Sequence, residues 1–109
     1  MKLVLIVYQD RDALDRFVRA VATERVAGVT IVPSSGIGRH AERTADEFQF
    51  GLSAILESRF AKHTTLLSIV PDERLPRLLE LMRQHMPTIE AGFDGLYAVL
   101  EVSQAGGVA

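Results

Sequence analysis

The stretch GVTIVPSSGIGRH, residues 28–40, joins a short apolar segment to a run of small polar residues. Residues 29–32 predict a β-strand, which runs through Pro33 into a turn. Little side-chain bulk covers the backbone of that turn, which contains Ser34, Ser35, Gly36 and Gly38. Bare N–H groups and the guanidinium of Arg39 then face one place, which favours an anion-binding site. An ordinary surface turn fits the same short pattern.

Before this stretch, the sequence predicts one strand and one helix. Residues 2–8, KLVLIVY, are aliphatic with almost no alternation, which is typical of a strand covered on both faces. Residues 12–24 have apolar side chains at helical spacing and charged ones on the other side. Asp10 or Asp12 is expected to cap this helix.

After this stretch, the sequence predicts two more strands and a second helix. Residues 63–70 are rich in β-formers and stop at Pro71. Asp72 is then expected to cap a leucine-rich helix that has Pro76 in its first turn and ends before Pro87. Two segments complete this part of the chain: a loop over residues 88–95 with an Asp94–Gly95 turn, and a strand over residues 96–102.

The remaining segment, residues 39–60, is less clear. Residues 39–46, RHAERTAD, are polar throughout and predict an exposed loop. Residues 47–60 fit a short helix weakened by Gly51. A strand extension over residues 48–52 is the competing interpretation.

The order strand, helix, strand, strand, helix, strand predicts an α+β fold of the ferredoxin-like βαββαβ type. Its four-stranded antiparallel sheet would have both helices on one face. In the first strand, Leu3, Leu5 and Val7 alternate with Val4 and Ile6, so both sides are apolar. Two helices on one face leave the other face uncovered. Because an apolar patch of that size is unusual in a soluble monomer, trimerisation through the sheet faces is one expected way of covering it.

Composition excludes several classes of function. The chain has 109 residues, which suits one domain, expected over 1–103 with a flexible C-terminal tail over 104–109. A net charge of −2 gives no reason to expect nucleic-acid binding. The absence of cysteine excludes disulfides and thiol catalysis. With no apolar run long enough for a bilayer and no secretory pattern, we expect a cytoplasmic protein without membrane insertion.

Catalytic and metal-binding patterns are weak. His40, His63 and His85 are too far apart in sequence to form a local metal pair, so no metal site is predicted. A contribution of His40, with acidic neighbours, to a site shared between subunits remains open. Ser34 and Ser35 lack the surrounding pattern of a nucleophile, and we expect no enzyme activity and no catalytic residue.

Three short motifs carry a resemblance to a known family. They are GVTIVPSSGIGR at 28–39, IVPDE at 69–73 and GFDGLYAVLEV at 92–102. In combination, and with the order of elements over about residues 1–102, they resemble the PII-like superfamily of signal-transduction proteins, to which nitrogen regulatory protein P-II belongs. The motifs are individually short and gain specificity only together.

The resemblance implies a homotrimer with a small-molecule effector, ATP or ADP, in each of three clefts between subunits. A T-loop base and a Gly-rich B-loop would hold the nucleotide, and the T-loop would contact a partner protein. Matched residue by residue, Thr30 lies near the adenine, residues 36–39 form the T-loop base, and the B-loop glycines are Gly92 and Gly95. The predicted ligand-binding set is therefore Thr30, Ser34, Ser35, Gly36, Ile37, Gly38, Arg39, Gly92 and Gly95.

The sequence also departs from this family's pattern. No Lys follows Lys62, and the C-terminal arginines are missing, so Arg39 is the one evident cation in the matched site. These departures favour an altered, less charged ligand, or none, over ATP with 2-oxoglutarate. We therefore expect a PII-like trimeric sensor that contacts its partner protein through residues 39–60. A metal-handling trimer resembling CutA proteins and a ligand-free oligomerisation module are the alternatives.

Overall fold

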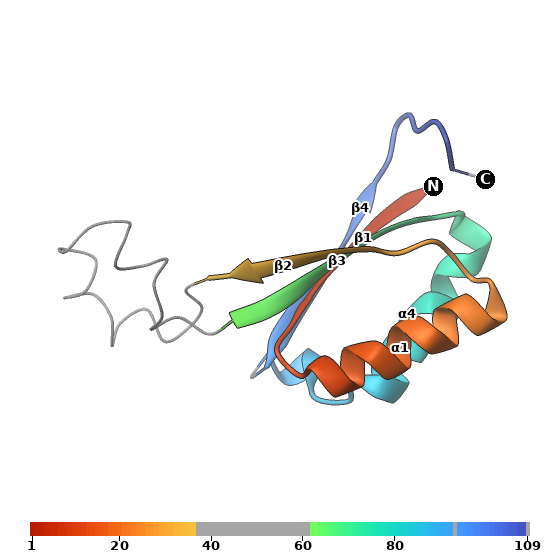
Figure 1. Cartoon of the computed structure of the whole chain (residues 1–109). Helices are drawn as coiled ribbons and strands as arrows, with labels where there is room; N and C mark the ends of the chain where they lie inside the picture. The colour runs from red at the N-terminus through yellow and green to blue at the C-terminus, as the bar shows by residue number, and fades with distance from the viewer. Residues whose placement is uncertain (37–61, 93, 109) are drawn as a thin grey trace, which may run out of the picture.

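Four strands and two main helices form one α+β unit in the computed structural model, which describes residues 1–36, 62–92 and 94–108 (Figure 1). The strands are β1 (Lys2–Tyr8), β2 (Thr30–Ser35), β3 (Lys62–Val70) and β4 (Gly95–Glu101). They form an antiparallel sheet in the order β2-β3-β1-β4. The predicted ferredoxin-like arrangement is confirmed.

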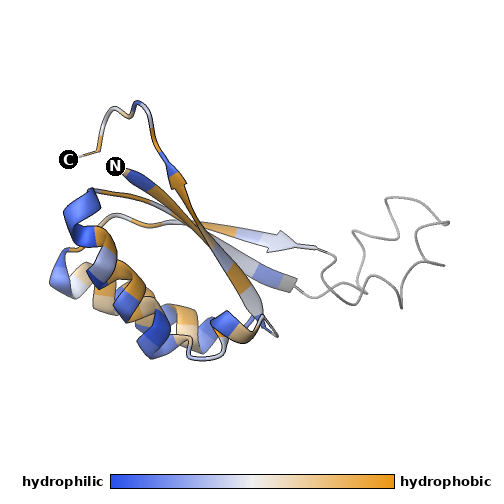
Figure 2. Cartoon of the chain, turned by 180° about the vertical axis from the view of Figure 1, so that it is seen from behind, coloured by the Kyte–Doolittle hydropathy of each residue, from blue (hydrophilic) through white to orange (hydrophobic). Residues whose placement is uncertain are grey.

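The helices α1 (Arg11–Glu24) and α4 (Leu75–His85) lie on the same face of the sheet (Figure 1). Asp10 caps α1, because its Oδ1 accepts hydrogen bonds from the backbone N–H groups of Asp12 and Ala13 at 3.0 and 3.1 Å. Arg25, in the left-handed region at φ 54°, ends the helix. Figure 2 shows that both helices turn their apolar sides toward the sheet. The largest fully buried side chains are Phe17, Leu66, Leu78, Met82, Met86, Val4, Val21 and Val70.

The two faces of the sheet differ in what covers them. On β1, Val4, Ile6 and Tyr8 are buried beneath the helices. Side chains directly opposite each other in a sheet share a face. The cross-strand partners of Leu3, Leu5 and Val7, followed from β1 to both edges, therefore identify the residues on the other face. We call it the open face; its apolar members are Leu3, Leu5, Val7, Val32, Leu67, Ile69, Leu96, Ala98 and Leu100. The prediction that β1 is apolar on both sides is confirmed.

The sequence-based boundary of β2 was wrong. The strand continues through Pro33 to Ser35, so Ser34 and Ser35 lie in the strand and not in a turn. Proline is tolerated here because β2 is an edge strand, where a missing N–H leaves no partner unsatisfied. Ser34 pairs with His63 across the ladder.

Two further local expectations were wrong. Asp72 does not cap α4; it lies in a 3₁₀ turn, η2 (Asp72–Arg74), and accepts a 2.8 Å hydrogen bond from the amino group of Met1. Residues 94 and 95 form no turn, because Gly95 is the first residue of β4. A second 3₁₀ turn, η3 (Ile89–Ala91), leads toward that strand.

The expected loop over 39–46 and the undecided segment over 47–60 lie outside the described residues. Among the helices that are described, none combines the length and the apolar character needed to cross a bilayer.

Candidate functional site

The β2–β3 pair projects beyond the rest of the sheet. The last complete row across all four strands is Pro33, Thr64, Tyr8 and Gly95. Past it, the pairs Ser34–His63 and Ser35–Lys62 are the only ones that continue among the described residues. We call these two pairs the ribbon end. Two-stranded ribbons are marginal without further contacts, so what holds the ribbon end matters for any site built on it.

A cluster of three polar side chains holds the ribbon end. The Oγ of Ser34 lies 2.7 Å from His63 Nδ1 and 2.8 Å from Thr65 Oγ1. The Ser34 hydroxyl also reaches the backbone carbonyl of His63 at 3.3 Å. All three residues are half-buried on the open face. The serine that was expected to be a bare turn hydroxyl is therefore a cross-strand connector.

The lack of a side chain at Gly36 leaves room for the imidazole of His63. A Cβ at this position would lie 3.0 Å from His63 Nε2, closer than ordinary contacts allow. The absence of a side chain at residue 36 thus lets the ring lie against the backbone. This close approach supplies a physical reason for one of the glycines in the predicted ligand-binding set.

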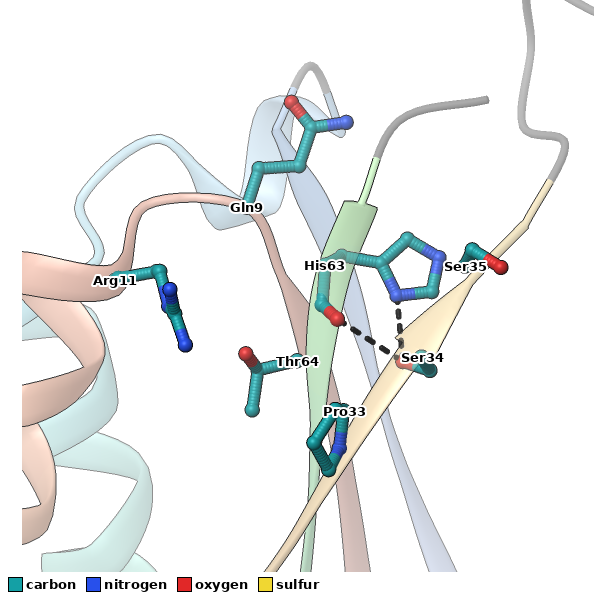
Figure 3. A pocket seen from close by; sticks show the side chains of 7 residues that line it. All are labelled: Gln9, Arg11, Pro33, Ser34, Ser35, His63 and Thr64. Carbon is teal, nitrogen blue, oxygen red and sulfur yellow. Dashed lines mark hydrogen bonds between the residues drawn. The ribbon is translucent and has the colours of Figure 1, made fainter. Parts of the chain in front are cut away.

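A pocket of about 370 Å³ surrounds the ribbon end (Figure 3). Arg11, the first residue of α1, lines the pocket from the helix side. The register places Pro33 and Thr64 on that side, and Ser34 and His63 on the open face. The lining residues are Gln9, Arg11, Pro33, Ser34, Ser35, His63 and Thr64. The guanidinium lies on the helix side and the imidazole on the open face, and each is a donor suited to an anionic or hydroxyl-rich ligand.

Sequence reasoning missed Gln9, Arg11, His63 and Thr64 as pocket residues. Arg11 lies just before the helix predicted over residues 12–24, and His63 was interpreted as the start of a strand. Only the pairing of β3 with both β1 and β2 brings the two regions to the same end of the sheet. A basic residue at the first position of a helix that follows the central strand was the one available signal.

Two further glycines of the predicted set, Gly92 and Gly95, lie at or next to β4, the opposite edge of the sheet. Gly92, at φ 75°, ends η3 in the left-handed region. A Cβ on Gly95 would lie 2.2 Å from the carbonyl oxygen of Val7, so only glycine fits there. These two glycines therefore have direct backbone reasons for their identity.

Asp94 ties this edge to the central strand. Its Oδ2 accepts hydrogen bonds from Tyr8 OH at 2.7 Å and from Thr88 Oγ1 at 2.5 Å, while its Oδ1 is buried without a partner in the described part of the chain. Burial opposes the charged form, but the bonds from Thr88 and Tyr8 outweigh it and lower the pKa of Asp94. The backbone N–H of Gln9 also donates to the Asp94 carbonyl at 3.1 Å.

One chain does not bring the two halves of the predicted set together. Ser34, Ser35 and Gly36 belong to the β2 edge, whereas Gly95 belongs to the β4 edge with β3 and β1 between them. Three strand spacings separate the edges by roughly 14 Å. Thr30 is exposed on β2 opposite Leu67, and Ile37, Gly38 and Arg39 lie outside the described residues.

A metal site finds no support in the described ranges, where no group of three or more His, Asp or Glu side chains is arranged to hold an ion. His40 and its acidic neighbours lie outside those ranges, so the idea of a shared site there stays a prediction.

Comparison with known proteins assigns this fold to a class of regulatory proteins. The family model described as nitrogen regulatory protein P-II matches residues 1–108. The chain therefore belongs to the P-II family, and the predicted resemblance is confirmed. No curated protein matches it significantly.

A solved structure shares the fold over nearly the whole chain. It is the crystal structure, at 2.40 Å resolution, of a DUF3240 family protein from Shewanella baltica OS155. The TM-score is 0.63 with 12% sequence identity, and the match covers 99% of this chain and 97% of that one. At this identity the likeness concerns the fold alone.

Proposed function

We propose that the protein is a trimeric PII-like sensor that binds a small anionic ligand in the seams between its subunits. Residues 39–60, which follow the ribbon end, would contact a partner protein. The observation that carries the proposal is the division of the predicted ligand-binding set between opposite edges of one sheet. Two copies placed edge to edge would complete a site that one chain leaves in halves.

The open face supports assembly into an oligomer. Leu96 and Leu100 are 53% and 46% exposed, and Val32 on the far edge is 41% exposed. They flank the half-buried Leu3, Leu5 and Val7 along the centre of the same face. Contiguous apolar surface of this kind marks interaction sites. Three copies meeting through this face would cover it, and membership of the P-II family favours that number.

The pocket at the ribbon end supports an anionic ligand. Missing cations were the main departure from the family's sequence pattern, and Arg11 supplies one from an unexpected element. Arginine binds phosphate and carboxylate through two parallel N–H groups. ADP and ATP are therefore the first ligands to test, with smaller phosphates and carboxylates after them.

Two measurements on the purified chain test the proposal. Light scattering should give about 36 kDa, three times the 12.0 kDa of the chain. Thermal unfolding should show stabilisation by one of the anions, because a ligand at 100 times its Kd adds about 2.7 kcal/mol. Arg11→Gln should weaken that effect, whereas Arg16→Gln, on the exposed side of the same helix, should leave it unchanged.

A mass of one chain would contradict the assembly. A trimer that no nucleotide, phosphate or carboxylate stabilises would contradict the sensor and leave the ligand-free oligomerisation module.

A further inference from the structure

Ser34 has more partners than it has protons. Its Oγ lies within hydrogen-bond distance of His63 Nδ1, Thr65 Oγ1 and the His63 carbonyl, at 2.7, 2.8 and 3.3 Å. A hydroxyl can donate one hydrogen bond and accept two. The direction of the Ser34 O–H therefore determines whether Thr65 and His63 each donate a hydrogen bond to Ser34 or accept one from it.

The imidazole sets that direction, because a neutral ring carries one proton on either nitrogen. With the proton on Nδ1, the ring donates to Ser34, and Ser34 must turn its own proton to Thr65 or to the carbonyl. With the proton on Nε2, Thr65 donates to Ser34 and Ser34 donates to Nδ1. In this second arrangement, every O–H and N–H points from Thr65 through His63 toward Nε2.

The second ring nitrogen faces the pocket wall formed by the end of β2. Nε2 is the ring atom nearest to the vacant Cβ position of Gly36, and Figure 3 shows it on the side of Ser35. His63 itself lines the pocket with Ser34 and Ser35. A hydrogen-bond acceptor bound there would require a proton on Nε2 and would thereby select the second arrangement.

We propose that Thr65, Ser34 and His63 form a hydrogen-bond relay that couples an oxyanion at His63 Nε2 to the stability of the ribbon end. The inference rests on the proposed function, since it assigns a regulatory role to the same pocket. Aligned hydrogen bonds polarise and strengthen one another. An acceptor at Nε2 would therefore tighten the contact between β2 and β3 at a point where no other described strand pairs with them.

The relay has a measurable consequence in backbone amide exchange of the full chain. Inorganic phosphate serves as the probe, compared with chloride at equal ionic strength. In the wild type, phosphate should slow the exchange of amides in residues 34–36 and 62–64 by severalfold. Removing the central hydroxyl with Ser34→Ala should speed this exchange about fivefold without phosphate, as the loss of one net hydrogen bond implies. It should also abolish the phosphate response.

His63→Asn separates the hydrogen bond to Ser34 from the ligand contact at Nε2. The asparagine amide occupies the position of Nδ1 and can still bond to Ser34, but it has no atom at the position of Nε2. Exchange without phosphate should therefore stay within about twofold of the wild type, and phosphate should no longer slow it. Ser103→Ala, which removes an exposed hydroxyl far along the chain, serves as the control and should behave as the wild type.

The outcomes distinguish the relay from the underlying site. If phosphate protects the ribbon end equally in the wild type and Ser34→Ala, an anion binds but the relay is wrong. If Ser34→Ala exchanges as slowly as the wild type without phosphate, the relay is also wrong. If phosphate does not bind the wild type by calorimetry, the relay is wrong for this probe. If no nucleotide or carboxylate binds either, the proposed anion site fails with it.

Discussion

The two faces of this sheet are built from the same strands and similar residues, yet among the described residues helices cover only one of them. On β1, Val4 and Ile6 are 1% and 2% exposed beneath α1 and α4, whereas Leu3, Leu5 and Val7 are only half-buried. In the described part of the chain, the difference lies in where the helices pack, because α1 and α4 both lie on the same face of the sheet. The covered face stabilises the chain, and the open face is the surface that we propose as the interface between subunits.

The largest effect is expected from the covered face. Phe17 on α1 is 1% exposed, and Phe17→Ala should lower the free energy of unfolding by about 3–5 kcal/mol. Urea unfolding measures this loss. A loss below about 1 kcal/mol would mean that the core is not packed as described.

A matched pair of substitutions separates the two faces. Leu96 and Ile31 are 53% and 54% exposed, both on edge strands, but the register places Leu96 on the open face and Ile31 on the helix face. Leu96→Glu should dissociate the assembly, because it would bury a charge in an apolar interface. Ile31→Glu should leave the assembly intact. Light scattering distinguishes the two variants, and equal behaviour would break the assignment of faces.

The β4 edge should be sensitive to a single methyl group. Gly95→Ala would push a Cβ against the Val7 carbonyl and Tyr8, so it should cost about 1–3 kcal/mol of stability. Gly28→Ala is the control, because nothing lies within 4 Å of its Cβ position. If both variants unfold at the same urea concentration, the close approach of β4 to β1 is wrong.

A smaller change in the free energy of unfolding is expected when the pH is lowered. The pKa of Asp94 is lowered in the folded chain, so its charged form contributes stability above the unfolded value of about 3.8, and this is lost as pH falls through the folded pKa. Asp94→Asn should therefore weaken the dependence of stability on pH below 4. Urea midpoints from pH 3 to 6 measure this. If the slope of stability against pH is the same in Asp94→Asn and the wild type, the hydrogen bonds from Tyr8 and Thr88 to Asp94 are not the cause of the acid sensitivity.

The sequence sufficed for the order of the described elements, because apolar periodicity marks the helices and strands, and Pro71 and Pro87 follow the ends of β3 and α4. It also sufficed for the open face, since Leu3, Leu5 and Val7 alternate with Val4 and Ile6 within a single strand. It did not predict that Ser34 and Ser35 lie in β2, because the tolerance of Pro33 depends on the strand being at an edge. Arg11 and His63 were missed as pocket residues, because only the register brings them near Ser34.

The central claim is that the β2 edge of one copy lies beside the β4 edge of another. The chain has no cysteine, so Ser35→Cys provides a single attachment point for a nitroxide label. Labelled protein is mixed and reassembled with isotope-enriched, unlabelled protein, so that any broadening of its NMR signals arises between chains. The account predicts broadening of the Gly92 and Gly95 amide signals. Signals that stay sharp in assemblies shown to contain both kinds of chain would contradict it.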